Sequence, residues 1–301
     1  MYRIKKSLLN LYRFCQYLFF DELFSFVDKL YFGRRIPVLK ISEIDSSKQK
    51  ILVIAAHSDD EILGMGGSLL MHDALNHEIV VLCVTDGSKS YNENLTKEQM
   101  VNTREEEARN LSHFFGHIRH VFMKLPSLEF GLSPILINNI KSFILKEAPD
   151  VVYVLSPIDK HPDHTWVGIA ALNAINEAGL NSIIRIFEVQ VPLTHLLANR
   201  YFDVSKYYQT KKHILRTYLS QKIMFHSFDK VLLYNKYLAK NTNGVKAIEA
   251  FKELHVSELD GFLKLLEHIK LPDWQIQTIT QYRFIYCTYS YMKKYCKENE
   301  L

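Results

Sequence analysis

Two short clusters of histidine and acidic side chains carry most of the chemistry that this sequence could support. The first, His57-Ser58-Asp59-Asp60-Glu61, directly follows an apolar run, and the second, His161-Pro162-Asp163-His164-Thr165, shortly follows another. Catalytic zinc sites are built from imidazole and carboxylate ligands, with three protein ligands and one open position. A further carboxylate could act as general base, and a further histidine could polarise a carbonyl group. The two clusters therefore indicate metal-assisted hydrolysis.

Each cluster taken alone also has a purely structural interpretation. Both stand where a strand would pass into a helix, and acidic residues at a helix N-terminus cap free amides and favour the helix dipole. A lone histidine in such a place is usually a satisfied surface or core residue. Here three histidines and four acids occupy equivalent ends of expected strands. This combination favours a metal site over two unrelated helix caps.

The elements that must position these clusters lie between Lys50 and about Gly179, where short apolar runs alternate with amphipathic stretches. The expected strands are 51–56, 79–85, 120–125 and 151–155, and the expected helices are 63–75, 97–115, 134–146 and 163–178. Strands that are apolar throughout and separated by helices predict an α/β fold, a Rossmann-like, mostly parallel sheet with helices on both faces. Ligands of such sheets bind beyond the carboxyl ends of the strands, where both clusters fall.

The pattern is looser after residue 181. We expect strands at 183–191 and 202–204, followed by helices at 207–219, 231–239, 245–254 and 274–297. Gly64-Met65-Gly66-Gly67 follows the first strand too late for a dinucleotide-binding turn, and no G-x-S-x-G elbow of a serine hydrolase is present.

The two clusters resemble the motifs of the PIG-L/LmbE-like family of zinc-dependent N-acetylglucosaminyl deacetylases, A-H-P-D-D-E and H-P-D-H. They stand here as residues 56–61 and 161–164, with Ser58 in the place where the family most often has proline. That side chain has no chemical role, so the departure leaves the catalytic scheme intact. Further agreement over residues 50–254 comes from Gly64-Met65-Gly66-Gly67, Thr85-Asp86-Gly87, Arg104-Glu105-Glu106-Glu107-Ala108, Ser220-Gln221 and Glu249-Ala250-Phe251.

The resemblance implies an LmbE-like enzyme that removes the N-acetyl group from an N-acetylglucosamine-type sugar conjugate and releases acetate and a free amine. The implied zinc ligands are His57, Asp60 and His164. Imidazole and carboxylate ligands would also accept Fe²⁺ or Co²⁺.

The same resemblance assigns the other polar residues of the two clusters. Asp59 would be the general base, and His161 would stabilise the oxyanion or act as general acid, with Asp163 orienting it. Arg104 would contact the sugar or its aglycone. Two alternatives stay open: hydrolysis of another amide, such as a thiol conjugate, by the same metal site, and a non-catalytic sugar-binding module.

We predict three segments: an N-terminal amphipathic helical appendage over 1–48, the deacetylase domain over 49–255, and a C-terminal helical tail over 256–301 packed on that domain. The N-terminal apolar stripe runs beside basic residues and is shorter than the roughly 20 residues of a spanning helix. It predicts either a helix packed on the domain or peripheral membrane contact through residues 1–30. The aromatic tail predicts core packing or a subunit contact, which would allow a homo-oligomer, rather than a carbohydrate platform.

The overall composition is that of an ordinary globular protein. The 301 residues are 48% hydrophobic and 23% charged, and the net charge of +4 is too small to predict nucleic-acid binding. The four cysteines form no C-x-x-C pair, so we expect neither a thiolate metal site nor a disulfide framework. We therefore expect a cytoplasmic protein, or one peripheral to the inner face of the membrane. The family resemblance implies a small-molecule or lipid-linked amino-sugar substrate.

Overall fold

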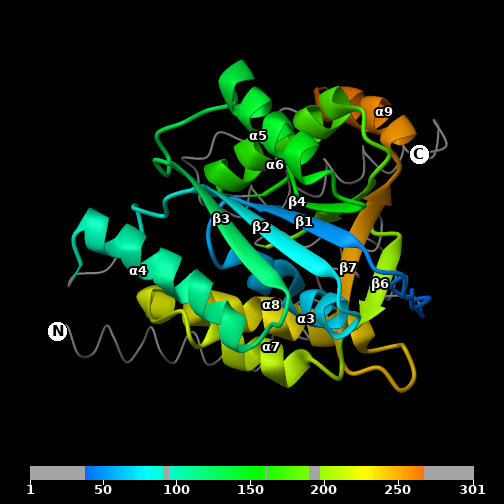
Figure 1. The fold of residues 1–301 in the computed structure, drawn as a ribbon. Helices are drawn as coiled ribbons and strands as arrows, with labels where there is room; N and C mark the ends of the chain where they lie inside the picture. Colours follow the sequence, from blue (N-terminus) through cyan, green and yellow to red (C-terminus); the bar gives the residue numbers. More distant parts are fainter. Residues whose placement is uncertain (1–37, 91–94, 160, 190–196, 268–301) are drawn as a thin grey trace.

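A seven-stranded sheet, in the order β3-β2-β1-β4-β5-β7-β6, forms the centre of the molecule (Figure 1). The computed structural model describes residues 38–267 except 91–94, 160 and 190–196. Strands β1 to β5 are parallel, and β7 pairs antiparallel with both β5 and β6. The strands are β1 (Lys50–Ala55), β2 (Glu78–Thr85), β3 (Ile118–Leu125), β4 (Val151–Leu155), β5 (Ile183–Phe187), β6 (Arg200–Asp203) and β7 (Ile248–Leu254).

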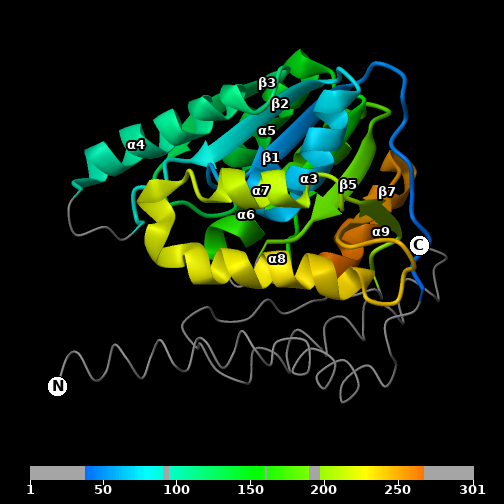
Figure 2. The ribbon, with the colours of Figure 1, turned by 90° about the horizontal axis from the view of Figure 1, so that it is seen from below.

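Helices cover both faces of this sheet. In Figure 1, α5, α6 and α9 lie on one side, and α3, α7 and α8 lie on the other. Figure 2 shows this second side, where α7 packs against α3 and α8 reaches the sheet at β7. The helical elements are α3 (Asp60–Ala74), α4 (Lys97–Arg109), η1 (Asn110–His113), α5 (Pro134–Glu147), α6 (Pro162–Ala178), α7 (Tyr208–Leu215), η2 (Leu219–Met224), α8 (Phe225–Ala239) and α9 (Val256–Glu267).

The apolar runs of the sequence form the core because their strands are covered on both faces. Every residue from Ile51 to Ala55 in β1 is fully buried, and β4 is buried along its whole length. Strands that are half exposed would instead alternate apolar with polar residues. The predicted α/β class, with a mostly parallel sheet between helices, is confirmed.

The prediction of a helix over 245–254 was wrong, because this segment contains strand β7. Its alanine, glutamate, lysine and leucine residues favour helices, yet all seven residues of β7 are buried between β5 and β6. Buried charges are tolerated there because they are paired: Glu249 with Lys211, and Glu253 with Arg185 and Arg200. Tertiary pairing has overridden local propensity.

Helix α3, which begins with Asp60, is interrupted at Met65, where φ is −143° and ψ is 21°. Beyond this kink the backbone amides of Gly67 and Ser68 donate to the Glu249 carboxylate, at 3.0 and 2.7 Å. A Cβ atom at Gly67 would lie 2.6 Å from Val204 Cβ, so the close approach requires glycine. Strand β7 therefore anchors the helix whose first turn carries part of the acidic cluster.

Both predicted appendages lie partly outside the described residues. The amphipathic N-terminal helix and the aromatic helix over 274–297 fall on residues 1–37 and 268–301, outside the described part. Helix α9 packs against α6 and adds Leu259, Phe262 and Leu265 to the hydrophobic core of the sheet. Within the part of the chain that the structure describes, every helix is too short or too polar to cross a membrane.

Candidate functional site

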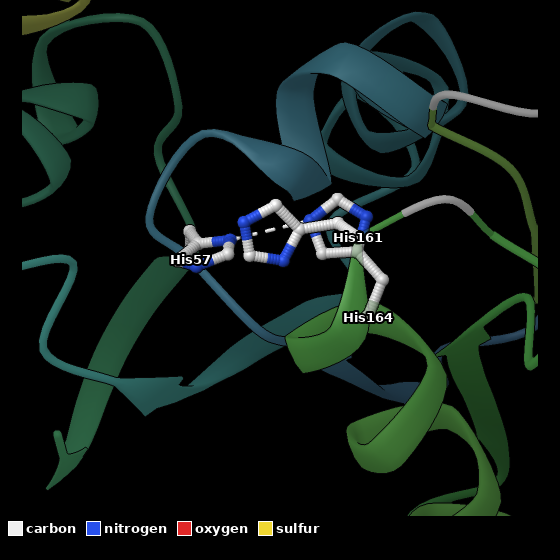
Figure 3. Close-up of side chains that lie close together, drawn as sticks. All are labelled: His57, His161 and His164. Atoms are coloured by element: carbon white, nitrogen blue, oxygen red, sulfur yellow. Dashed lines mark hydrogen bonds between the residues drawn. The ribbon is translucent and has the colours of Figure 1, made fainter. Parts of the chain in front are cut away.

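The two histidine clusters lie side by side at the carboxyl ends of β1 and β4. These strands are parallel neighbours, so the segments that follow them leave the sheet at the same edge. His57 lies between β1 and α3, His161 caps the N-terminus of α6, and His164 lies in the first turn of α6. Figure 3 shows the three imidazole rings gathered at this point.

Three potential ligand atoms converge on one point between these elements. His57 Nδ1 lies 3.2 Å from His164 Nε2 and 3.5 Å from Asp60 Oδ2, and His164 Nε2 lies 3.3 Å from Asp60 Oδ1. With bonds of about 2.0–2.1 Å, two ligands of a tetrahedral zinc ion stand about 3.4 Å apart. The three side chains that the sequence predicts as ligands therefore have the spacing that such an ion needs.

The remaining ring nitrogen of each of these histidines faces a carboxylate. His57 Nε2 lies 3.0 Å from Asp163 Oδ2, and His164 Nδ1 lies 3.2 Å from Asp159 Oδ1. Metal-binding histidines commonly have a carboxylate partner on the nitrogen that does not bind the metal, because it fixes the ring and its tautomer. Each of the two histidines therefore has a carboxylate partner that can fix the orientation of its ring.

The predicted role of Asp163 needs correction. We expected it to orient His161, but its carboxylate contacts His57, and its other oxygen accepts the backbone N–H of Leu128 at 3.0 Å. The contact with His161 runs through the Asp163 backbone N–H, which donates to His161 Nδ1 at 3.2 Å. The reason is local: Asp163 lies in the first turn of α6, so its amide faces the capping side chain of His161.

His161 lies beside the three converging side chains rather than among them. Its ring stacks on His164, with centroids 4.8 Å apart, and meets His57 edge-on at the same centroid distance. The ligand atoms of the three imidazoles reach up to 4.8 Å apart, wider than a tetrahedral edge. Burial and the neighbouring charges of His57 and His164 lower the pKa of His161 to about 3, so its ring is neutral. Because Nδ1 accepts a hydrogen bond, the neutral ring carries its proton on Nε2.

The pair of Asp60 and His164 has the electrostatics of a site that exchanges protons for a cation. Burial opposes the charge of both groups, but their mutual attraction outweighs it. The pKa of Asp60 is therefore lowered well below its usual value and the pKa of His164 is raised well above its own. A metal ion binding here would displace a proton from His164.

Asp59 and Arg104 form a buried ion pair next to these residues. Arg104 Nη2 donates to Asp59 Oδ1 at 2.9 Å, and Nη1 donates to Ser90 Oγ at 2.8 Å. The guanidinium lies against Gly87, where φ is +64° and a Cβ atom would stand 2.7 Å from Arg104 Cδ. Arg104, which we predicted to contact the sugar, is only 3% exposed and holds Asp59.

All of these residues except Asp159 and Asp163 line one cavity of about 510 Å³. Its polar part is the histidine and aspartate cluster with Arg104, and basic side chains of Lys89 and Lys230 also line it. Its apolar part comes from five separate segments of the chain, namely Leu63, Leu128, Val189, Met224, Phe228 and Val231. The size and mixed lining suit a small organic molecule with polar and apolar parts.

Sequence reasoning missed Asp159 and the wall contributed by η2 and α8. The sequence could have identified Asp159, because this acidic residue lies between a buried strand and His161. That position falls at the edge of the sheet where ligands bind. The wall residues Met224, Phe228 and Val231 gave no such signal, since apolar residues of a helix predict only that it packs against something.

Comparison with known proteins agrees with this geometry. A family model described as PIG-L, GlcNAc-PI de-N-acetylase, matches residues 52–175. A diacetylchitobiose deacetylase from Thermococcus kodakarensis is 28% identical over 223 residues, which cover 67% of this chain and 79% of the relative.

Solved structures with low sequence identity share the fold. An N,N'-diacetylchitobiose deacetylase from Pyrococcus horikoshii superposes with a TM-score of 0.63 at 20% identity, covering 80% of this chain and 94% of that one. The 4-carboxy-2-hydroxymuconate hydratase GalB from Pseudomonas putida KT2440 gives 0.59 at 17% identity, covering 68% and 96%. The fold thus serves different reactions. Residues 52–175, which contain both histidine clusters, are the part of this chain that is similar to the PIG-L family.

Proposed function

We propose that this protein is a zinc-dependent N-deacetylase that hydrolyses the acetamido group of an N-acetylglucosamine-type sugar conjugate. The observation that carries the proposal is the convergence of His57 Nδ1, Asp60 and His164 Nε2 within 3.5 Å of one another, beside Asp59 in a cavity. The family match and the deacetylase activity named for the Thermococcus relative support the choice of reaction.

His57, Asp60 and His164 would hold the ion. When bound, zinc would polarise the acetyl carbonyl and lower the pKa of a water molecule toward about 7. Asp163 and Asp159 would keep the two imidazoles in the tautomer that binds a metal, because each faces the opposite ring nitrogen.

Asp59 would act as the general base that takes a proton from the attacking water. The hydrogen bond from Arg104 occupies its Oδ1, which fixes the carboxylate in the cavity and leaves Oδ2 to accept the proton. Arg104 is therefore assigned a positioning role in addition to any contact with the sugar.

His161 would stabilise the developing oxyanion by donating a hydrogen bond to it. Its Nδ1 accepts from the backbone of Asp163, so the proton on Nε2 is free to be donated toward the carbonyl oxygen. A neutral His161 keeps this proton, so the proton that Asp59 takes from the water would pass to the departing amine, which leaves acetate and a free amino sugar as products.

The test is to load the purified protein with zinc and incubate it with a panel of N-acetylglucosamine conjugates, N,N'-diacetylchitobiose among them. Released acetate and new primary amine are measured. We expect turnover by the wild type, and a loss of about 10²-fold or more in Asp59→Ala with one equivalent of zinc retained. Zinc binding without acetate release from any conjugate would overturn the proposed substrate class, and an active Asp59→Ala variant would overturn the role of Asp59.

The proposed substrate is a small or lipid-linked conjugate, and the proposed location is the cytoplasm or the inner face of the membrane. The second option depends on residues 1–30, which lie outside the described part of the chain. Fractionation of a lysate tests it: full-length protein that stays soluble beside intact membranes would argue against membrane contact.

A further inference from the structure

Leu128, in the segment between β3 and α5, has the left-handed backbone conformation, with φ of +60°. This region is sterically disfavoured for leucine and costs about 1–2 kcal/mol. Among the described non-glycine residues, Asn76, Lys124 and Ala148 also have positive φ, but of these four only Leu128 lines the cavity. The backbone strain therefore coincides with the candidate active site.

The surrounding structure holds this conformation from both sides. The Leu128 N–H donates to Asp163 Oδ1 at 3.0 Å, and the preceding Ser127 N–H donates to Asp86 Oδ1 at 3.1 Å. Ser127 Oγ in turn accepts the N–H of Gly87 at 3.0 Å. Strained residues persist only where neighbouring contacts determine them in this way.

The two residues after Leu128 are also anchored. Glu129 pairs with Lys89 at 2.5 Å, and the Phe130 ring packs edge-on against Trp166 of α6, with centroids 5.5 Å apart. The segment is thus fixed on each side of Leu128. The Leu128 side chain therefore has a defined position in the lining of the cavity.

Neither the backbone nor the core accounts for a leucine here. Glycine would offer the same N–H to Asp163 without strain. The side chain is 46% exposed and lines the cavity, so core packing does not require it. Its apolar surface is available to a molecule in the cavity, where it would stand with the apolar side chains of Phe228 and Val231.

We propose that Leu128 is a specificity-determining residue that makes an apolar contact with the body of the substrate beside the histidine cluster. The inference rests on the proposed function and deepens it: the preferred sugar conjugate presents an apolar face or substituent at this wall. The strained loop holds the leucine at a fixed place, so the contact costs little side-chain ordering when substrate binds.

Two substitutions separate this contact from the backbone geometry. Leu128→Gly removes the side chain, and Leu128→Asn replaces it with a polar one of similar size; both residues tolerate positive φ. Leu132→Asn is the matched control, because Leu132 is 47% exposed in the same segment and is not a cavity residue. The probe is the panel conjugate that the wild type hydrolyses with the highest kcat/KM.

We expect both Leu128 variants to raise KM by about tenfold with kcat changed less than about twofold, the pattern for lost ground-state binding. Leu132→Asn should leave both constants unchanged. Thermal unfolding should give Leu128→Asn a Tm equal to or above that of the wild type, since strain is relieved. In Leu128→Gly the larger entropy of the unfolded chain offsets this gain, so its Tm should stay close to that of the wild type.

Three results would overturn the inference. If the wild type is active and both variants keep its KM, Leu128 does not contact the substrate, while the proposed function would stand. A lower kcat with unchanged KM would show that Leu128 acts only through Asp163 and His57. A Tm well below that of the wild type in both variants would show that the leucine side chain is needed to stabilise the fold. A wild type that is inactive toward every conjugate would instead overturn the proposed function itself.

Discussion

Two buried clusters of charge contact α3, one at its first turn and one just beyond its kink, and they are built in opposite ways. At the kink, the Glu249 carboxylate accepts bonds from the amides of Gly67 and Ser68, from Ser68 Oγ at 2.6 Å, and from Lys211 Nζ at 2.6 Å. Lys211 also donates to Asn235 Oδ1, and neither charged side chain is exposed. In this cluster, which we call the sealed pair, every acceptor meets a donor.

At the start of α3 the balance differs. Two imidazole nitrogens and a carboxylate approach one another within 3.5 Å, and these groups are all acceptors once the histidines are neutral. They also face a cavity, unlike the sealed pair. Burial of charge therefore does not distinguish a functional site from a structural one. What distinguishes them is whether the protein supplies the complementary groups or leaves that task to a ligand, here the metal ion that we propose.

The substitution His164→Ala should have the largest effect and is the strongest test of the contrast between the two clusters. Removing one of three ligands should lower zinc affinity by more than about 100-fold, beyond the loss typical of an outer partner, and abolish turnover. Zinc content after dialysis and acetate release would be measured together. His113→Ala, at an exposed histidine, is the control and should bind one equivalent. Full zinc content in His164→Ala would show that the ion, if any, binds elsewhere.

A substitution in the sealed pair should instead lower the stability of the protein. Lys211→Met leaves Glu249 buried without its cation, which should cost about 3–5 kcal/mol in the free energy of unfolding. Denaturant titration measures it, with the exposed neighbour substitution Lys212→Met as control. The folded fraction of Lys211→Met should bind zinc with unchanged affinity. A loss below about 1 kcal/mol would show that the pair contributes little.

The carboxylates behind the histidines should give an intermediate effect. Asp159→Asn and Asp163→Asn preserve shape but remove the charge that each imidazole faces, so zinc affinity should fall by about 10–100-fold in each. Competition with a chelator gives the affinities. Equal affinity in wild type and both variants would mean that these carboxylates do not support the ligands.

The smallest expected effect is the dependence of stability on pH. In the metal-free protein the pKa of His164 is raised in the folded state, because attraction to Asp60 and Asp159 outweighs burial. This stabilisation is fully present below pH 6.5 and is lost as pH rises through the raised pKa, by at most about 1.4 kcal/mol per pH unit. Tm of the metal-free protein should therefore fall above pH 6.5, while the increase in Tm on adding zinc should grow. A zinc effect that shrinks with rising pH would contradict the exchange of a proton for the ion.

The sequence by itself determined the α/β class and the edge at which chemistry is placed. Apolar runs such as 51–56 and 151–155 report burial on both faces, and parallel strands bring the segments after them to one edge. The neighbourhood of His57 and His164 follows from that rule. The ligand and base roles of these residues stay predictions until metal and turnover are measured.

Only the tertiary structure decided which partner each charged group meets. The segment 245–254 has helical composition, yet it is strand β7, because Lys211, Arg185 and Arg200 arrive from elsewhere in the chain to pair its glutamates. Asp163 faces His57 instead of its neighbour His161 for a similar reason. Periodicity reports how much of a segment is buried, whereas hydrogen bonds and ion pairs depend on distances between segments far apart in sequence, and those distances exist only in the folded chain.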